Sequence, residues 1–238
     1  METTQQQQTI RTVFVGTYCP AGTLSSYYVN SLADTIKQCL VNGIRIMPLF
    51  INDIASAVVA KNEMLAIVQN QDYESIVFID HNMAWDSGTL INVINSQYDA
   101  MALPSVKKVG NGAIFDLEIG SEIARDQNGY IKVNYASTAM FKLSSKLVTE
   151  LCDSNLSITN PTGNEVKNVF DTTTQTGRFF NEGVVLCNKI RALGHDIWVN
   201  PVSTCANIAD NIYAADFAAS IAPQVAPAIT DEIKTLYA

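Results

Sequence analysis

The residues best suited to chemistry follow a short apolar run, Ser75–Ile79, which is succeeded directly by Asp80, His81 and Asn82. This run is too short for a stable helix and is rich in β-branched and aromatic residues, so we expect a fully buried strand. In open α/β sheets, ligands bind beyond the carboxyl ends of the parallel strands. Asp80 and Asn82 would there offer oxygen atoms to a ribose or a divalent cation. The alternative is that Asp80 only caps the next helix.

The elements that must position this strand alternate between apolar and amphipathic segments. Strands are expected at residues 12–15, 44–50, 75–79, 98–103 and 197–199, and helices at residues 28–40, 56–69, 87–95, 144–152 and 183–193. This β-α order indicates an α/β fold with a mostly parallel, Rossmann-like mixed sheet flanked by helices. Residues 113–119 and 130–135 alternate as strands around a turn at residues 126–129, which predicts an antiparallel hairpin excursion.

Length and composition favour a single folded domain. The chain has 238 residues, of which 47% are apolar and 16% charged, and α/β domains commonly reach this size. We expect a disordered lead at residues 1–10, the main domain at residues 11–206, and a mostly helical tail at residues 207–238 packed on the same domain. The lead lacks the pattern of a signal peptide, and no apolar run is long enough to predict a membrane span.

Cysteine content and charge restrict the compartment and the partners. The five cysteines are scattered, without a C-x-x-C pair, which favours reduced thiols in the cytoplasm over disulfides or a zinc site. The formal net charge of −8 gives no support to a broad nucleic-acid-binding surface, although a local basic groove is compatible with an acidic protein.

Several segments occur in an order that resembles a known family. They are Gly16-Thr17 after the first strand, Lys61-Asn62 in the second helix, residues 78–85, residues 102–108, Glu182-Gly183, and residues 190–201. Together these segments resemble the nucleotide-diphosphosugar transferase (GT-A) fold. More narrowly, they are similar to the small family-2-like glycosyltransferases of phages and large viruses. The resemblance covers residues 12–201.

The resemblance assigns a nucleotide-sugar donor, with a UDP-sugar favoured, to the first half of the chain. The loop after the first strand holds the base and ribose in this family, which here implies Gly16, Thr17 and Tyr18. The helical pair that helps to bind the nucleotide corresponds to Lys61 and Asn62.

The resemblance also assigns the acidic motif and the start of the late helix. Asp80 stands where the family contacts the ribose, and Asn82 stands at the metal-binding position. The acidic pair that opens the late helix falls on Glu182 and Gly183. If the enzyme is active without a tightly bound metal, Lys107, Lys108 or Arg178 would neutralise the departing diphosphate, and Glu182 would be the candidate base.

The chain departs from the family pattern at three places. Asn82 replaces a metal-binding Asp, Gly183 replaces the usual basic Asp, and residues 203–207 lack the expected His. Since Mn²⁺ and Mg²⁺ prefer anionic oxygen ligands, a strong site built on Asp80 and Asn82 is not favoured, and the metal would be weakly held or absent.

Two functions remain open on these residues. In the first, the protein is an active glycosyltransferase, with Glu182 as base or with a retaining mechanism that needs no separate protein base. By analogy with phage members of the family, its acceptor would be a modified DNA base or a glycan. In the second, catalysis is lost and the fold serves binding or assembly. A sugar nucleotidyltransferase is disfavoured, because the segment from Gly16 to Gly22 carries no basic residue.

Overall fold

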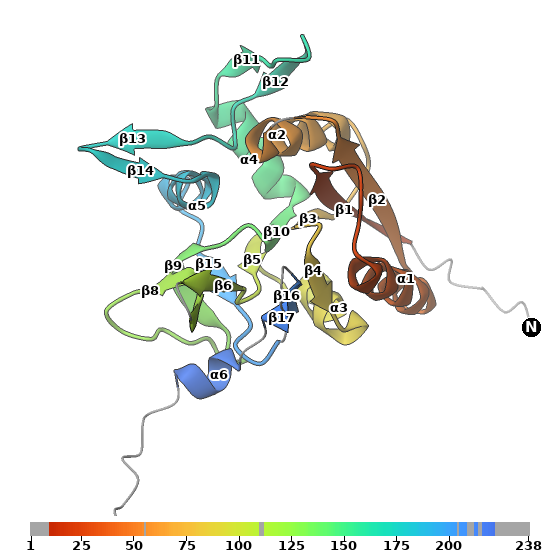
Figure 1. Ribbon diagram of the computed structural model, residues 1–238, viewed down its shortest axis with the longest axis vertical. Helices are drawn as coiled ribbons and strands as arrows, with labels where there is room; N and C mark the ends of the chain where they lie inside the picture. The colour runs from red at the N-terminus through yellow and green to blue at the C-terminus, as the bar shows by residue number, and fades with distance from the viewer. Residues whose placement is uncertain are drawn as a thin grey trace, which may run out of the picture.

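The apolar segments of the chain form one eight-stranded mixed sheet in the computed structural model (Figure 1). The structure describes residues 10–54, 56–109, 112–203, 205–208, 212–213 and 216–221. In sheet order, the strands are β2 (Ile44–Asn52), β1 (Arg11–Cys19), β3 (Ser75–Ile79), β10 (Met140–Ser144), β5 (Ala100–Ala102), β15 (Ile197–Val199), β9 (Ile131–Ala136) and β8 (Leu117–Ile119).

The sheet contains both parallel and antiparallel strand pairs, as expected for a mixed sheet. The pairs β1/β2, β1/β3 and β5/β15 are parallel, as the β-α order predicts. Strand β10 lies between β3 and β5 and is antiparallel to both. Only residues 137–139 separate β9 from β10. This short connection does not turn the chain back as a hairpin would, so β10 keeps the direction of β9, which is antiparallel to β15.

Helices cover both faces of the sheet. On one face lie α1 (Ser26–Val41) and α3 (Ser87–Asn95), and on the other lie α2 (Ala57–Val68), α4 (Ser145–Ser154) and α5 (Glu182–Ala192). Alternate residues of β3 point to opposite layers, so Ile76 and Phe78 join the α2, α4 and α5 cluster while Val77 and Ile79 join the α1 and α3 cluster. A strand covered on both faces is continuously apolar, and the prediction of a buried strand is confirmed.

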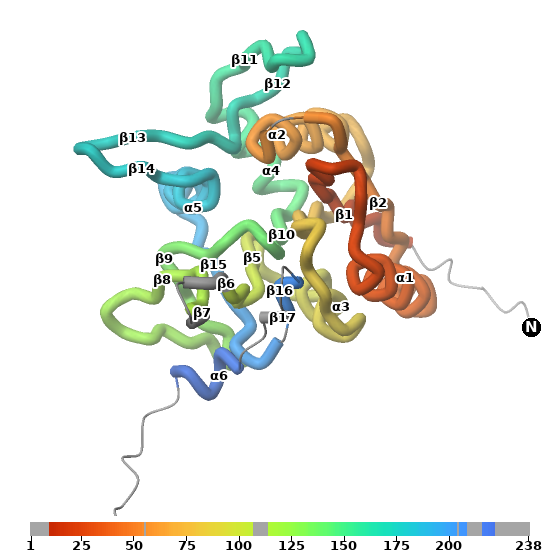
Figure 2. The backbone as a smooth tube through the Cα atoms, in the orientation of Figure 1, coloured from red at the N-terminus to blue at the C-terminus, as the bar shows by residue number. Residues whose placement is uncertain are grey.

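Small antiparallel units lie beside the main sheet. Figure 2 shows two of them, in the cyan part of the chain, extending outward as hairpins. The units are β4 (Met83–Trp85) with β16 (Cys205–Ile208) and β17 (Ile212–Tyr213), β6 (Val106–Val109) with β7 (Gly112–Phe115), β11 (Ser157–Thr159) with β12 (Glu165–Lys167), and β13 (Thr173–Gln175) with β14 (Arg178–Phe180). The last two hairpins occupy the polar segment between α4 and α5.

The C-terminal region departs from the helical expectation. Asn207 and Ile208 belong to β16, which pairs with β4, and Ile212–Tyr213 forms β17. Helix α6 (Phe217–Ser220) is the helical segment that the structure describes here. The predicted lead falls outside the described residues except for Ile10, and so does the tail after residue 221. Among the described residues, no helix is long and apolar enough to cross a membrane.

Candidate functional site

Asp80 lies at the carboxyl end of β3, where the sequence places it. Its backbone N–H donates to the carbonyl of Ala139, just before β10, at 2.9 Å, and its carbonyl accepts from Met83 N at 3.0 Å. Neighbouring protein atoms desolvate the carboxyl group, yet 43% of the side chain remains exposed to solvent. The site formed by Asp80, Lys61 and Glu182 is called the recess below. Burial in this recess raises the pKa of Asp80; nearby Lys61 lowers it and Glu182 raises it further.

Lys61 brings three elements together at this recess. It belongs to α2 and is only 3% exposed. Its ammonium group donates to Thr138 Oγ1 at 2.7 Å and lies 3.5 Å from Glu182 Oε1 and 3.9 Å from Asp80 Oδ1. The same group lies 5.7 Å from the centre of the Phe170 ring, within the range of a cation–π contact. A buried lysine is costly unless it is paired, and here its partners are the two candidate functional carboxylates.

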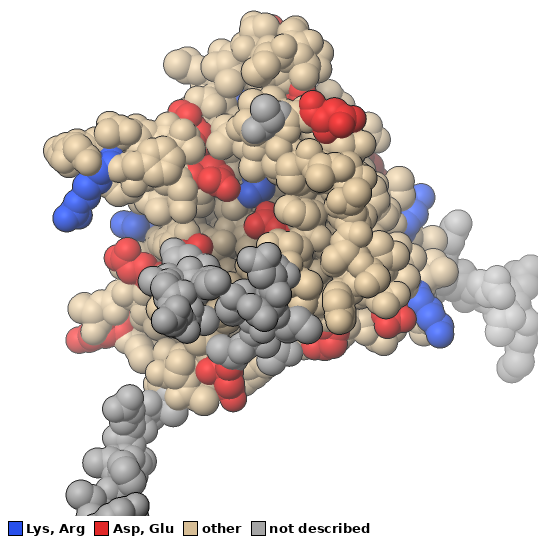
Figure 3. Space-filling model, viewed as in Figure 1, with Lys and Arg blue, Asp and Glu red and all other residues tan. Residues whose placement is uncertain are grey.

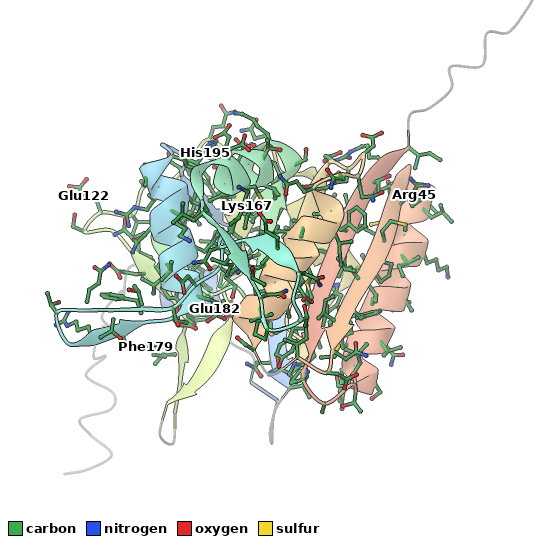
Figure 4. The ribbon with its side chains drawn as sticks, turned by 90° about the horizontal axis from the view of Figure 1, so that it is seen from above. Arg45, Glu122, Lys167, Phe179, Glu182 and His195 are labelled. Atoms are coloured by element: carbon green, nitrogen blue, oxygen red, sulfur yellow. The ribbon has the colours of Figure 1, made fainter. Side chains whose placement is uncertain are left out.

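Glu182 opens α5, and the local sequence explains its place. The side chain of Asn181 caps the helix by accepting from Val184 N at 3.0 Å. An acidic residue in the first turn is favoured by the helix dipole. Glu182 is 26% exposed at its side chain, and Figure 4 shows it at the base of the β13–β14 hairpin.

The glycine at position 183, where the family has an Asp, does not leave the recess without a carboxylate. A Cβ atom on this residue would lie 3.1 Å from Tyr135 Cε2 and 3.6 Å from the Ala136 carbonyl. A side chain at position 183 would therefore press against β9. Glu182, one residue earlier, is the residue of this pair that contacts Lys61.

The face shown in Figure 3 has acidic and basic side chains close together near its middle, at the edge of a hollow. Asp80 and Glu182 come from elements 102 positions apart in the chain, and both lie within 4.0 Å of Lys61. Two carboxylates around one ammonium leave the recess acidic, with one open carboxylate at the end of β3 and another at the start of α5.

The first-strand residues lie deeper than the resemblance implies. Strand β1 continues to Cys19 rather than ending at Gly16. A Cβ on Gly16 would come within 2.8 Å of Met64 Sδ, so this glycine makes room for α2. Thr17 is fully buried and hydrogen-bonds the Tyr28 hydroxyl, while the Tyr18 hydroxyl donates to the carbonyl of Ile54.

Asn62 also faces inward. Its Nδ2 donates to the Phe170 carbonyl and its Oδ1 accepts from Phe170 N, both at 2.8 Å, and the side chain is buried. Both polar ends of the amide therefore serve one residue of the protein. This clamp holds Phe170 beneath Lys61, which makes Asn62 a support of the recess.

Asn82 is linked to the C-terminal strand β16. Its Nδ2 donates to Asn207 Oδ1 at 2.9 Å, and its carbonyl accepts from Ile208 N at 2.7 Å. Asn207 in turn lies within 3.4 Å of the Val106 carbonyl on β6. Residue 82 is thus held beside the recess by neutral amides.

The donor set around Asp80 does not fit a conventional divalent cation. The group nearest to its carboxylate that carries a full charge is the Lys61 ammonium, and the position two residues later is an amide already bonded to Asn207. Among the described residues, no cluster of three His, Cys, Asp or Glu side chains is arranged to hold a metal. We therefore derive no chemical step from a metal at this site.

The remaining predicted basic residues lie on hairpins. Lys107 and Lys108 belong to β6, and their side chains are outside what the structure describes. Arg178 is exposed at the start of β14, four residues before Glu182. The structure thus brings Asp80, Lys61 and Glu182 together, and places Arg178 on a projecting element next to them.

Three residues of the site have no predicted role in the sequence analysis. Thr138 anchors the Lys61 ammonium, Phe170 lies under it, and Asn207 bonds Asn82. Thr138 and Phe170 carry no motif that would single them out. Asn207 lies in the segment that lacks the family's histidine, so its position was a usable signal.

The two histidines have structural surroundings. His195 bridges Glu150 at 2.7 Å and Asp99 at 3.2 Å, near the amino end of β5 and away from the recess. His81 follows Asp80 in the turn before β4. Neither contributes a described hydrogen bond to the Lys61 cluster.

No protein-family model and no curated protein sequence matches the chain. Solved structures do match. A197 from STIV is similar with a TM-score of 0.54 and 13% identity, over 87% of this chain and 91% of that one. This likeness shows a shared fold and nothing finer.

Weaker likenesses include named transferases. The catalytic domain of Drosophila β1,4-galactosyltransferase 7 has a TM-score of 0.47 and 8% identity, over 80% of this chain and 65% of its own. TarS residues 1–349 of S. aureus have a TM-score of 0.43 and 12% identity, over 80% of this chain and 58% of their own. Other matches with TM-scores below 0.5 are also named as transferases, among them a CTP transferase and a further glycosyltransferase. The predicted α/β fold, a mixed sheet flanked by helices, is confirmed by the strand order and by the helices on both faces.

Proposed function

We propose that this protein transfers a sugar from a nucleotide-sugar donor, with a UDP-sugar as the first choice, to an acceptor hydroxyl. The observation that carries the proposal is the convergence of Asp80 and Glu182 on the buried Lys61. One carboxylate ends a central strand and the other opens a helix, so the two lie on separate rigid elements beside one recess. Catalytic groups held by rigid elements keep their geometry during the reaction.

Asp80 and Glu182 have different roles in this proposal. Asp80 accepts a hydrogen bond from a ribose hydroxyl of the donor. Glu182 takes the proton of the acceptor hydroxyl as its oxygen forms a bond to the anomeric carbon. The bond from that carbon to the diphosphate breaks, and the nucleoside diphosphate leaves with the electron pair. Direct displacement of this kind inverts the anomeric configuration, which NMR of the product would report.

The surroundings of the other predicted donor-binding residues suggest a role for each of them. Asn82 lies two residues beyond Asp80, and Val106 of β6 lies next to its partner Asn207, which supports Lys107 and Lys108 as ligands of the leaving diphosphate. Arg178 is a third basic candidate on β14. Thr17, which is buried, supports the recess through its bond to Tyr28.

A second candidate function is donor binding without transfer. One observation favours it: an amide already bonded to Asn207 stands at position 82, where the family places a metal ligand. In that case the protein would bind a nucleotide sugar at Asp80 and release it unchanged.

The test is incubation of the purified protein with a panel of nucleotide sugars, with and without Mn²⁺, followed by detection of free nucleoside diphosphate. We expect release with at least one UDP-sugar and thermal stabilisation by the same compound, because a ligand that binds only the native state raises its stability. Stabilisation without release would support the binding function. The absence of both nucleotide release and thermal stabilisation with every donor would overturn the proposal.

Glu182→Gln separates a base from a helix-capping charge. Glutamine keeps the shape and removes the proton acceptor, so transfer should fall by roughly 10²- to 10⁴-fold while donor affinity is retained. The matched control is Glu122→Gln, because Glu122 is an exposed acid on a loop that Figure 4 shows away from Glu182. Wild-type turnover in Glu182→Gln would remove Glu182 from the mechanism.

A further inference from the structure

The β13–β14 hairpin is an exposed ribbon beside the recess. Its two strands pair only with each other among the described strands, and the turn contains Thr176 and Gly177 at positive φ (49° and 75°). Figure 1 shows the ribbon extending from the body next to α5. An isolated two-stranded hairpin is marginally stable in water, and this one displays a phenylalanine, Phe179, that is 68% exposed.

The pairing register defines what each face of the ribbon presents. Thr174 pairs with Phe179, so the aromatic ring and a hydroxyl share one face. Thr173 pairs with Phe180, and that second face is partly buried. The open face is therefore an aromatic surface next to a neutral hydrogen-bonding group.

Chain connectivity places this face close to the candidate base. Strand β14 ends at Phe180, Asn181 caps α5, and Glu182 follows. Three residues span at most about 11 Å, so a molecule lying on Phe179 can present a hydroxyl to Glu182. Figure 4 shows Phe179 and Glu182 on the same side of the molecule.

Charge argues against a nucleic acid on this surface. The protein carries a formal net charge of −8, and the recess holds Asp80 and Glu182 against one ammonium group. Binding of DNA depends mainly on cationic groups that neutralise phosphates. Within the hairpin itself, residues 173–180 carry one charge, that of Arg178.

The hairpin's chemistry suits a sugar ring instead. Apart from Arg178, its polar side chains are the hydroxyls of three threonines and the amide of Gln175. A saccharide has an apolar C–H face, which packs on an aromatic ring, and hydroxyls, which bond to threonine and glutamine groups.

We propose that the open face of the β13–β14 hairpin binds the acceptor and that this acceptor is a neutral saccharide. The assignment rests on the glycosyltransferase function proposed above and specifies its second substrate. The sugar ring packs against the side chain of Phe179. Glu182 accepts the proton from a hydroxyl of that sugar.

The first test measures saccharide binding without any donor. Ligand-observed NMR would compare the wild type, Phe179→Ala and Phe179→Trp against xylobiose, cellobiose, chitobiose and lactose, with a single-stranded and a duplex DNA oligonucleotide as competing classes. The control is Leu156→Ala, because Leu156 is an exposed apolar residue at the distant β11–β12 hairpin. We expect binding of at least one saccharide, weakened roughly 5- to 30-fold in Phe179→Ala and restored in Phe179→Trp.

A second test uses the donor. Phe179→Ala should raise the acceptor KM without a matching loss of UDP-sugar affinity. The inference would be overturned by saccharide binding of equal strength in the wild type and in Phe179→Ala. It would also be overturned if no saccharide bound at millimolar concentration, or if DNA bound in preference. If the wild type binds saccharide through Phe179 but neither binds nor cleaves any nucleotide sugar, the proposed transfer fails while the saccharide surface stands.

Discussion

Two buried lysines, Lys61 and Lys142, differ in what surrounds them. Each is 3% exposed. Lys61 meets the carboxylates of Asp80 and Glu182, which remain partly open to solvent. The ammonium of Lys142 donates to the Ile94 carbonyl at 3.2 Å, and to the carbonyl and hydroxyl of Ser96 at 2.7 and 3.1 Å, so it caps the end of α3.

The difference shows that burial of a charge is not by itself a sign of function. The partners of Lys142 are mainly backbone carbonyls that need a donor because the helix ends there. The partners of Lys61 are charged side chains that a substrate can reach. Burial lowers the pKa of Lys142 to about 8, as expected for an ammonium whose partners carry no full charge.

The largest expected effect is on donor affinity, and it should differ between variants of Lys61 and Lys142. Lys61→Met removes the cation between two carboxylates, so we expect UDP-sugar affinity to fall by roughly 100-fold or more, measured by calorimetric titration. Lys142→Met should keep donor affinity and lose about 1–3 kcal/mol of unfolding free energy, because carbonyls at the end of α3 lose their donor. Unchanged donor binding in Lys61→Met would show that Lys61, like Lys142, has no role in donor binding.

Asp80→Asn tests the open partner of Lys61. Because its pKa is raised in the folded state, the ionised carboxyl disfavours folding at neutral pH, and this cost disappears as the pH falls below the folded pKa. We therefore expect an equal or higher melting temperature at pH 7, no gain at pH 3, and donor binding weakened roughly 10- to 100-fold.

The control for Asp80→Asn is Asp72→Asn, since Asp72 is exposed before β3. It should change neither quantity. A clear drop in the melting temperature of Asp80→Asn would mean that Asp80 serves the fold rather than the donor.

A pH-dependent effect on stability is expected for Lys142. Its pKa is lowered to about 8 from an ordinary value of 10.5, so the unfolded chain binds more protons between these limits and the stability it contributes rises with pH there. Relative to Lys142→Met, the wild type should gain up to about 3 kcal/mol from pH 8 to pH 10.5. Urea unfolding at several pH values measures this difference, and a flat difference would contradict the assignment.

The smallest expected effect concerns metal. Since Lys61 lies beside Asp80 and Asn82 is bonded to Asn207, we expect UDP-sugar affinity to be unchanged after treatment with EDTA. Titrations before and after chelation provide the measurement. A strict requirement for micromolar Mn²⁺ would show that these side chains rearrange to bind the ion.

Much of the framework was accessible from local sequence patterns. The apolar run of β3 predicts a strand buried on both faces, and the polar residues after it predict a functional edge. Asn181 and Glu182 before an amphipathic segment predict the start of α5, because a capping amide and an acid suit the free N–H groups there. The direction of β10 was not accessible, since its segment alternates like any strand and its partners are distant in sequence.

The sequence by itself determined most strands and helices of the main sheet, the position of Asp80 at the end of β3, and the α/β class of the fold. Only the tertiary structure decided which polar residues meet there. Lys61 bonds Thr138 and Glu182 across 77 and 121 positions, Asn62 turns inward to Phe170, and Gly16 makes room for Met64 rather than for a ligand. Periodicity and capping act within a few residues of the chain, whereas such contacts arise from the packing of α2 and α5 on the sheet, which no local pattern encodes.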